Sequence, residues 1–310
     1  MAAAARGSDT LDAMTSAAPF GTVLTAMVTP LKEDLSVDLD AVQRVAKHLV
    51  EHGHDGLVVS GTTGESATTT VAEDAETLAA VKDAVGDRVK ILAGVGTNDT
   101  RTTVELAQQA EKVGADGLLL VTPYYNKPGQ RGVTEHFRQV VAATDVPVML
   151  YDVPGRTGTA ISLEVYREAA TWDTVVAVKE AAGDLARGPR LLDLGLAVYS
   201  GDDALNLAWL AHGAAGLVSV AGHVCGDLLR AMHDQFTGGD HAAALETYTR
   251  MLPAIDAIMG VPNYGATTAK AALELTGVLD NRRVRSPLVE LDDAEVAALR
   301  VGLEAAGLLP

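Results

Sequence analysis

Short runs of apolar, largely β-branched residues alternate along the chain with segments whose apolar residues recur every three or four positions. The apolar runs cover residues 22–29, 56–60, 89–95, 117–122, 147–153, 174–179, 196–200 and 216–220. In one intervening segment, Leu39, Val42 and Ala46 are spaced as on one helix face. Asp38 precedes this segment as a candidate N-cap. The pattern therefore predicts strands in the apolar runs and helices between them.

Two further signals place helix ends. Thr70 and Glu73 have the spacing of a capping box, in which each residue's side chain bonds to the other's backbone N–H. This spacing predicts a helix that begins after Thr70. Gly114 ends the helical pattern that starts near Asp99, because glycine readily adopts the left-handed conformation that closes many helices.

Uninterrupted apolar strands that alternate with helices predict an α/β fold, with a parallel sheet that is covered on both faces. Eight such units fit a (β/α)8 TIM barrel. An open doubly wound sheet is the alternative, because periodicity alone does not distinguish the two. Residues 224–275 and 293–307 have helical patterns, and residues 280–291 read as an irregular connection.

These boundaries predict three parts of the chain. We expect a flexible N-terminal tail over residues 1–19, a barrel with the active site over residues 20–240, and a small C-terminal helical region over residues 241–310.

The composition narrows the class of protein. Of the 310 residues, 48% are hydrophobic and 21% are charged, which is ordinary for a globular protein. A net charge of −17 disfavours a general nucleic-acid-binding role. The single cysteine, Cys225, excludes an intrachain disulfide, and no apolar stretch reaches the ~18 residues of a membrane helix. We expect a cytoplasmic protein, since Asp9 and Asp12 interrupt any signal-peptide core.

Polar residues collect where the predicted strands end. They lie in residues 60–66, 123–129, 151–158 and 200–203, and at Lys179. The active sites of α/β barrels form at these carboxyl ends and in the loops that follow them. The sequence therefore predicts a site at this end of the barrel.

Lys179 ends an otherwise apolar strand. Apolar surroundings favour the neutral amine over the ammonium, and a neutral lysine amine can attack a carbonyl group to form a Schiff base. The alternative is a lysine paired with Glu180, its ammonium in solvent.

Three other features fit the same site. The loop over residues 61–66 offers glycine flexibility, hydroxyls and free backbone N–H groups that can hold a small carboxylate. The Tyr151 phenol can pass a proton, and the planar guanidinium of Arg156 suits a carboxylate. Tyr124 and Tyr125 are adjacent and point in different directions. The alternatives are an ordinary turn, packing tyrosines and a surface arginine.

Taken together, these motifs resemble those of the pyruvate-dependent class I aldolases, and among them the dihydrodipicolinate synthase family. The resemblance covers residues 20–310 and is carried by GTTGES (61–66), TPYYNKP (122–128), YDVPGRTG (151–158), VKEAAG (178–183) and SGDDA (200–204). It implies a barrel with C-terminal helices, and four copies of the chain assembled as a homotetramer that is a dimer of dimers. It also implies condensation of pyruvate with L-aspartate 4-semialdehyde in the diaminopimelate and lysine pathway, without a metal or organic cofactor.

The resemblance also implies roles for individual residues. Lys179 would form the Schiff base. Tyr151, Thr62 and Tyr125 would relay protons, with Tyr125 reaching a neighbouring subunit's site. The substrate-binding residues would be Thr63 for the pyruvate carboxylate, Arg156 for the carboxylate of the aldehyde, and Val218.

Two other activities stay open at this point. Another pyruvate-dependent aldolase, such as an N-acetylneuraminate lyase or a keto-sugar-acid aldolase, would keep Lys179 and Tyr151. A catalytically idle relative that binds pyruvate or a partner protein is the alternative from a different class. The doubled threonine at 62–63 and Arg156 favour the short, charged aldehyde.

The sequence departs from the family at several positions. Asp152 stands where the family often has asparagine. Val71 and Asp74 stand where lysine-inhibited members have histidines, and Thr102 replaces an acidic ligand of the inhibitor. We therefore expect weak or absent feedback by lysine.

Overall fold

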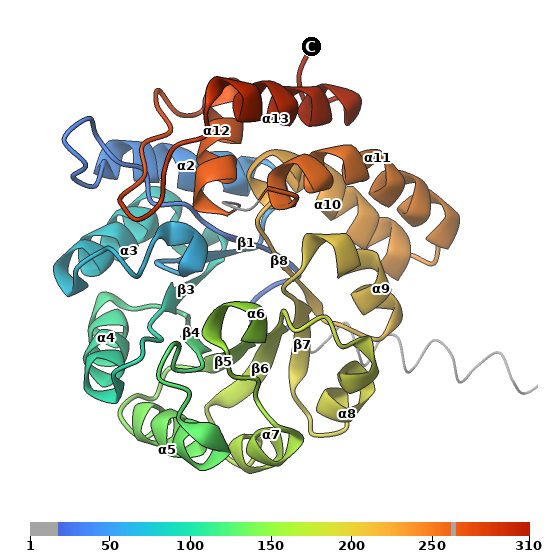
Figure 1. Ribbon diagram of the computed structural model, residues 1–310. Helices are drawn as coiled ribbons and strands as arrows, with labels where there is room; N and C mark the ends of the chain where they lie inside the picture. The colour runs from blue at the N-terminus through green and yellow to red at the C-terminus, as the bar shows by residue number, and fades with distance from the viewer. Residues whose placement is uncertain (1–17, 262–264) are drawn as a thin grey trace, which may run out of the picture.

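Eight parallel strands form a closed barrel at the centre of the molecule, with helices around it (Figure 1). The computed structural model describes residues 18–261 and 265–310. The strands are β1 (Val23–Ala26), β2 (Gly56–Val59), β3 (Lys90–Gly94), β4 (Gly117–Val121), β5 (Val148–Asp152), β6 (Val175–Glu180), β7 (Ala197–Ser200) and β8 (Gly216–Ser219). Each lies within one of the predicted runs or ends one residue beyond it. The strand prediction is therefore confirmed.

The barrel closes because the first strand pairs with the last. Leu24 of β1 is in register with Gly56 of β2 on one side and with Val218 of β8 on the other. The closed barrel confirms the predicted fold class, and the open doubly wound sheet is wrong. The expected tail over residues 1–19 falls almost wholly outside the described residues.

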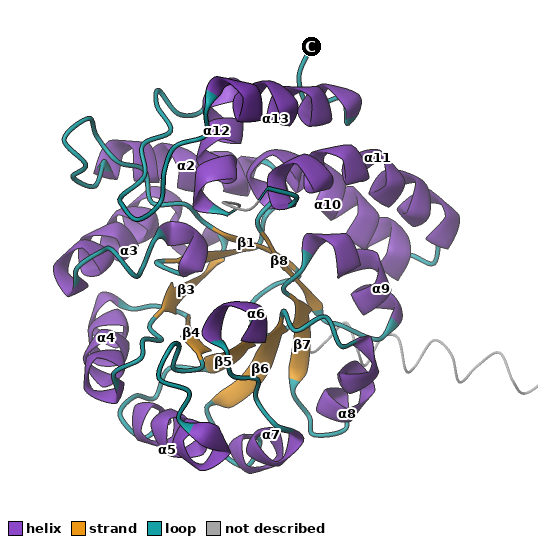
Figure 2. Cartoon of the chain, in the orientation of Figure 1, coloured by secondary structure: helices purple, strands orange, loops and turns teal. Residues whose placement is uncertain are grey.

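Helices follow the strands in alternation (Figure 2). The longer ones around the barrel are α2 (Leu39–Glu51), α3 (Val71–Val85), α4 (Thr100–Val113), α5 (Gly129–Val141), α7 (Leu163–Ala169) and α10 (Gly222–Thr237); the shorter ones are α6 (Pro154–Thr157), α8 (Gly188–Leu192) and α9 (Asn206–Ala211). The 3₁₀ turns are η1 (Thr62–Gly64), η2 (Gly86–Arg88), η3 (Leu185–Arg187) and η4 (Asp203–Leu205).

The predicted helix ends are confirmed. An Asp38 carboxylate oxygen accepts a hydrogen bond from the backbone N–H of Ala41 at 3.0 Å. At the start of α3, the Thr70 hydroxyl accepts from the Glu73 N–H at 3.2 Å, and the Glu73 carboxylate accepts from the Thr70 N–H at 2.8 Å. Gly114 ends α4 with a φ of +88°.

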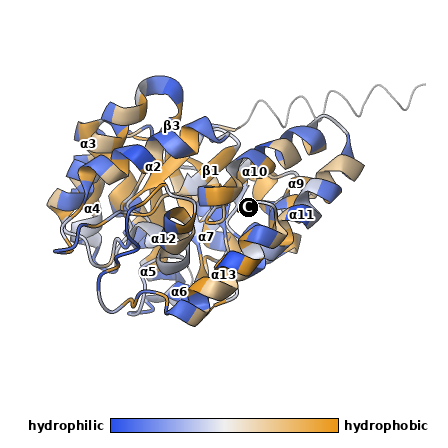
Figure 3. Cartoon of the chain, turned by 90° about the horizontal axis from the view of Figure 1, so that it is seen from above, coloured by the Kyte–Doolittle hydropathy of each residue, from blue (hydrophilic) through white to orange (hydrophobic). Residues whose placement is uncertain are grey.

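The C-terminal helices α11 (His241–Met259), α12 (Ala266–Leu275) and α13 (Asp293–Ala305) pack with α10 against one side of the barrel (Figure 1). Figure 3 shows hydrophilic and hydrophobic segments along α13. Its Leu299 and Leu303 are buried, whereas Arg300 is exposed. Because α10 contacts both β1 and α11, the division of the chain at residue 240 stays a prediction.

Alternate strand residues face two different cores. Residues such as Val58, Leu119 and Val218 fill the barrel, whereas their chain neighbours pack outward against the helices. This alternation is expected of strands, whose side chains point to opposite faces in turn. Among the described residues, no helix is long and apolar enough to cross a membrane.

Candidate active site

Lys179 lies at the carboxyl end of β6 with its side chain toward the barrel interior. Ala177, two positions earlier, belongs to the interior core, and the intervening Val178 faces the helices. Only 4% of the surface of Lys179 is exposed. Burial lowers the pKa of its ammonium from 10.5 to about 8; the carboxylate of Asp203 opposes this shift and the charge of Arg156 adds to it. The site therefore holds a lysine that supplies neutral amine near physiological pH.

Tyr151 lies beside this amine. It is near the end of β5, in direct register with Lys179 of β6. The Lys179 Nζ atom lies 4.4 Å from the centroid of the Tyr151 ring, and Tyr151 is 6% exposed. Two strand ends thus bring an amine and a phenol together inside the barrel.

The alternative of an exposed lysine paired with Glu180 is wrong. Glu180 points to the opposite face of β6, where its carboxylate accepts hydrogen bonds from the N–H groups of Ala182 at 3.1 Å and Gly183 at 3.2 Å. Burial raises the pKa of Glu180 to about 7. Lys179 and Glu180 therefore lie in separate environments although they are adjacent in sequence.

Asp152 joins the environment of Glu180 on the outside of the barrel. Its buried carboxylate accepts from Arg187 Nη1 at 2.9 Å, from the Tyr166 hydroxyl at 3.2 Å and from the Ile161 N–H at 3.2 Å. An aspartate at this position has a cationic partner, which explains how the chain accommodates it in place of asparagine. The substitution leaves the interior face of β5 to Tyr151.

Gly201, directly after β7, leaves room for the Lys179 side chain. A Cβ atom at this position would lie 3.1 Å from Lys179 Cγ and 2.8 Å from Ala181 Cβ. Both separations are shorter than ordinary van der Waals contact. The absence of a side chain at Gly201 therefore permits the close approach of the segment after β7 to the aliphatic stem of Lys179.

A cavity of about 960 Å³ opens at the same end of the barrel. Four residues expected from the sequence line it, namely Thr62, Thr63, Tyr125 and Arg156. Val121 and Val153 line it next to Tyr151, because Val121 pairs with Tyr151 across β4 and β5. Lys179 and Tyr151 are not lining residues; they lie deeper, in the barrel. The volume suits a ligand larger than pyruvate alone.

The loop after β2 presents two threonines in different environments. Thr62 is exposed and Thr63 is buried, both within η1. The Thr29 hydroxyl donates to the Gly64 carbonyl oxygen at 2.7 Å, which ties the end of η1 to the segment after β1. The loop is therefore a fixed turn at the cavity edge.

Tyr125 and Val218 lie in different environments. Tyr125 is 88% exposed, with a φ of +72°, whereas the adjacent Tyr124 is half-buried. Val218 is buried among the residues that fill the barrel, and it does not line the cavity. The structure thus brings Tyr125 to the cavity rim and leaves Val218 inside the core.

Sequence analysis missed several residues of the site. Gly265, Ala266, Pro287 and Leu288 line the cavity from the C-terminal region, although no local motif marks them. Asp202 caps η4. The adjacent Asp203 instead accepts from the N–H groups of Val220 and Ala221, and from the Ser219 hydroxyl. It therefore joins the end of β7 to the end of β8.

Metal ligation has no candidate cluster among residues 18–261 and 265–310, where no group of three or more His, Cys, Asp or Glu side chains converges suitably. The chemistry that the described side chains can supply is that of a low-pKa amine beside a phenol.

Comparison with known proteins gives consistent matches. The profile of the dihydrodipicolinate synthetase family matches residues 19–306. A 4-hydroxy-tetrahydrodipicolinate synthase of Kineococcus radiotolerans is 55% identical over 94% of this chain and 95% of that protein. A protein of the same name from Acidothermus cellulolyticus is 53% identical over 94% of each chain.

Solved structures agree with these matches. The dihydrodipicolinate synthase DapA-2 of Bacillus anthracis is 36% identical, with a TM-score of 0.88 over 92% of this chain and 98% of that one. A lysine-bound structure of the enzyme from Cyanidioschyzon merolae is 39% identical, with a TM-score of 0.90 over 94% of this chain and 99% of that one.

Proposed function

This chain belongs to the dihydrodipicolinate synthetase family, and from that premise we propose that it condenses pyruvate with L-aspartate 4-semialdehyde to give 4-hydroxy-tetrahydrodipicolinate. The observation that carries the proposal is the buried Lys179 amine, 4.4 Å from the ring centroid of Tyr151 at the carboxyl end of the barrel. The reaction belongs to diaminopimelate and lysine biosynthesis, and we infer that the protein acts in the cytoplasm.

The reaction begins at the Lys179 amine. Its neutral form attacks the keto carbon of pyruvate, and loss of one water molecule gives an iminium ion. The positive nitrogen makes a methyl proton acidic, and loss of that proton gives an enamine. Tyr151 is the nearby group that can accept and return protons in these steps, with Thr62 as its partner in the relay.

Carbon–carbon bond formation follows. The enamine carbon attacks the aldehyde carbon of L-aspartate 4-semialdehyde, and the aldehyde oxygen takes up a proton to become the 4-hydroxyl group. The substrate's own amine then adds to the carbon that bears Lys179, and Lys179 leaves as the free amine. The sum is one ring product and one water molecule from two substrates, so Lys179 is regenerated.

Both substrates carry carboxylates, whereas the protein has a net charge of −17. Local donors must therefore outweigh the overall field. Thr63 and the N–H groups of its turn bind the pyruvate carboxylate. Arg156, which lines the cavity from α6, binds the carboxylate of the aldehyde through its planar guanidinium. Val218 contributes an apolar wall below the bound substrate.

Tyr125 completes the site of a second copy of the chain. Its ring is 88% exposed although it lies on the cavity rim. An aromatic ring on a loop tip is well suited to burial in a partner. This arrangement supports a tight dimer in which each Tyr125 extends the partner's proton relay, and two such dimers form the homotetramer.

The test is to measure product formation from pyruvate with L-aspartate 4-semialdehyde and, separately, with N-acetylmannosamine. Only the charged aldehyde should be consumed. Arg156→Leu should raise the KM for that aldehyde by about tenfold or more, because a charge-assisted contact is lost. Arg101→Leu, at an arginine that is largely exposed on α4, is the matched control. Consumption of the sugar alone would overturn the proposal in favour of a sugar-acid aldolase.

A further inference from the structure

The turn that carries Thr62 and Thr63 ends at a residue in an unusual conformation. Glu65 has φ +61° and ψ +32°, the left-handed region that residues with a side chain seldom adopt. Its side chain is only 2% exposed. Such a conformation persists where the surroundings determine it on several sides. The contacts of its carboxylate are therefore informative about what fixes the turn.

Both carboxylate oxygens of Glu65 are held by the C-terminal region. Oε1 forms an ion pair with the Lys270 ammonium of α12, whose side chain is 1% exposed. Oε2 accepts from the backbone N–H of Arg285 at 2.8 Å. Lys270 also donates to the Arg283 carbonyl oxygen at 2.7 Å. The turn is thus fastened to two separate C-terminal segments through one side chain.

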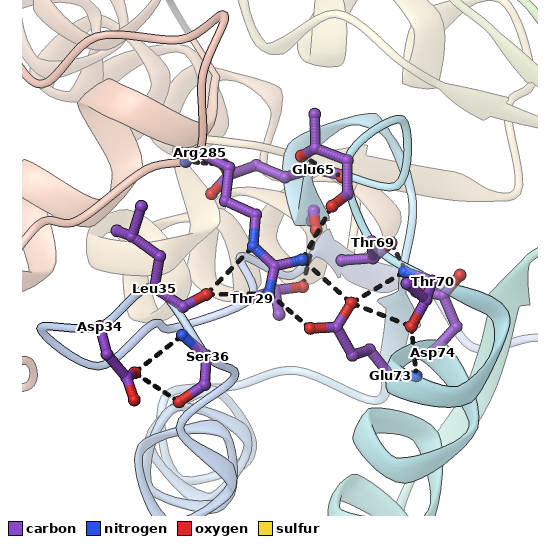
Figure 4. Close-up of polar contacts among 12 residues, drawn as sticks. Thr29, Asp34, Leu35, Ser36, Glu65, Thr69, Thr70, Glu73, Asp74 and Arg285 are labelled. Carbon is purple, nitrogen blue, oxygen red and sulfur yellow. Dashed lines mark hydrogen bonds and ion pairs between the residues drawn. The ribbon is translucent and has the colours of Figure 1, made fainter.

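Arg285 fastens the next part of the same loop. Its guanidinium donates to the Thr68 carbonyl oxygen at 2.8 Å and pairs with the Glu73 carboxylate, which also caps α3. It further donates to the Leu35 carbonyl oxygen at 2.8 Å. Figure 4 shows Arg285 in the middle of these groups, with Glu65 on one side and Glu73 on the other. The segment from Glu65 to Glu73 is therefore held at both ends.

The helix that carries Lys270 also borders the cavity near Arg156. Gly265 and Ala266, at the start of α12, line the cavity. A Cβ atom at Gly265 would lie 3.7 Å from Nη2 of Arg156. One helix therefore approaches Arg156 at its start, and it holds the threonine turn through Lys270.

We propose that Glu65 and Lys270 are positioning residues, which hold Thr62 and Thr63 in the geometry that receives the pyruvate carboxylate. This inference rests on the proposed function. A role in positioning the turn can be distinguished from a role in stabilising the fold, because a buried ion pair can often be replaced by uncharged groups without loss of stability. The pair is then retained for the shape of the turn, and its removal affects pyruvate binding more than folding.

The test is the double variant E65Q/K270M, which removes both charges together and leaves neither one unpaired. The matched control is E274Q/R282M, which removes another ion pair between α12 and the connection before α13. Pyruvate dependence is measured as the rate of borohydride-trapped adduct against pyruvate concentration, beside KM and kcat for the complete reaction and the urea midpoint of unfolding.

E65Q/K270M should raise the KM for pyruvate about tenfold or more, because Thr62 and Thr63 lose their fixed turn. Its trapping rate at saturating pyruvate and its KM for the aldehyde should each stay within about twofold of the wild-type values. Its urea midpoint should lie within the scatter of the midpoint of the control variant. Should this variant fail to fold, Glu65→Asp, which keeps the charge but withdraws the carboxylate by one methylene, should show the same rise in KM. Lys270→Arg keeps the charge, so its KM for pyruvate should be lower than that of the single variant Lys270→Met.

An unchanged KM for pyruvate in a folded E65Q/K270M protein would overturn the inference, as would an equal rise in the control. Neither outcome affects the proposed function, provided the wild-type protein forms the pyruvate adduct. Absence of any adduct in the wild-type protein would instead overturn the proposed function itself.

Discussion

The low pKa of Lys179 leads to a quantitative prediction about its reactivity. With a pKa of about 8, roughly a tenth of this amine is neutral at pH 7, against about 1 in 3,000 for a solvated lysine. The neutral fraction alone should therefore make Lys179 about 300 times more reactive than a solvated lysine toward a carbonyl compound at that pH. At pH 9 Lys179 is already mostly neutral, whereas the neutral fraction of the solvated lysine is still rising with pH. The ratio should then fall to about 30.

The assay uses pyruvate well below saturation, with cyanoborohydride to reduce the imine. A short peptide with one solvated lysine is added to the same tube, so that the pH dependence of the reducing agent cancels in the ratio of the two adduct yields. Samples at half-unit steps from pH 6 to 9.5 are digested and quantified by mass spectrometry. The ratio should be constant below about pH 7 and decline about tenfold per pH unit well above pH 8.

A ratio that stays constant up to pH 9.5 would refute the reasoning, because it would mean that Lys179 titrates like a solvated lysine. The same result would remove the physical basis for a neutral nucleophile at physiological pH. It would also mean that burial at 4% exposure does not act on the ammonium as expected.

Four further predictions follow from the structure. Tyr151→Phe keeps the ring beside Lys179 but removes the phenol, so kcat should fall by roughly 100-fold or more while the unfolding free energy in urea changes little; a kcat near wild type would contradict the proton relay. Gly201→Ala places a Cβ atom 3.1 Å from Lys179 Cγ, and adduct formation should slow roughly tenfold or more; an unchanged rate would show that β7 yields freely. Burial lowers the pKa of His54 to about 4 in the folded state, so only the unfolded state takes up this proton as the pH falls from 6.5 toward 4, and stability is lost in that window. Wild-type protein should therefore lose about 2 kcal/mol more than His54→Gln between pH 7 and 5 in urea titrations, and equal losses would contradict the assignment. Finally, L-lysine below millimolar concentration should leave the rate of condensation unchanged, and half-inhibition in that range would refute the expectation.

The strands could be predicted from the sequence because each is a short apolar run between helical patterns. Periodicity alone did not predict the closure of the barrel, because closure depends on pairing between β1 and β8, which are far apart in the chain; the motifs that resemble the aldolase family did. Local periodicity predicts that a strand is buried on both faces, and it carries no information about which strand lies beside it.

Lys179 and Tyr151 could be predicted from the sequence, whereas the ion pair that holds the threonine turn could not. Lys179 and Tyr151 each end an apolar run, so their strand assignments alone place them at one end of the barrel. Glu65 and Lys270 are 205 residues apart, and neither lies in a pattern that predicts the other. The exposed environment considered for Lys179 was wrong because adjacent strand residues face opposite sides, so Glu180 is outside the barrel.

Fold comparison and site geometry support the same chemistry by separate routes. The family match spans residues 19–306, whereas the low-pKa amine follows from burial at a single strand end. Arg156, which the proposed function assigns to the carboxylate of the aldehyde, lies on α6 after β5. The Arg156 experiment therefore tests the substrate, and the Lys179 experiments test the nucleophile.

The most direct test of the central claim is to locate the pyruvate adduct. Wild-type protein and Lys179→Ala are each incubated with pyruvate, reduced with borohydride, digested and mapped by mass spectrometry. The adduct should lie on the wild-type peptide that contains Lys179, and the variant should carry none. An adduct on Lys127, which lines the cavity, or one that persists undiminished in Lys179→Ala, would contradict the claim that the buried Lys179 amine is the nucleophile.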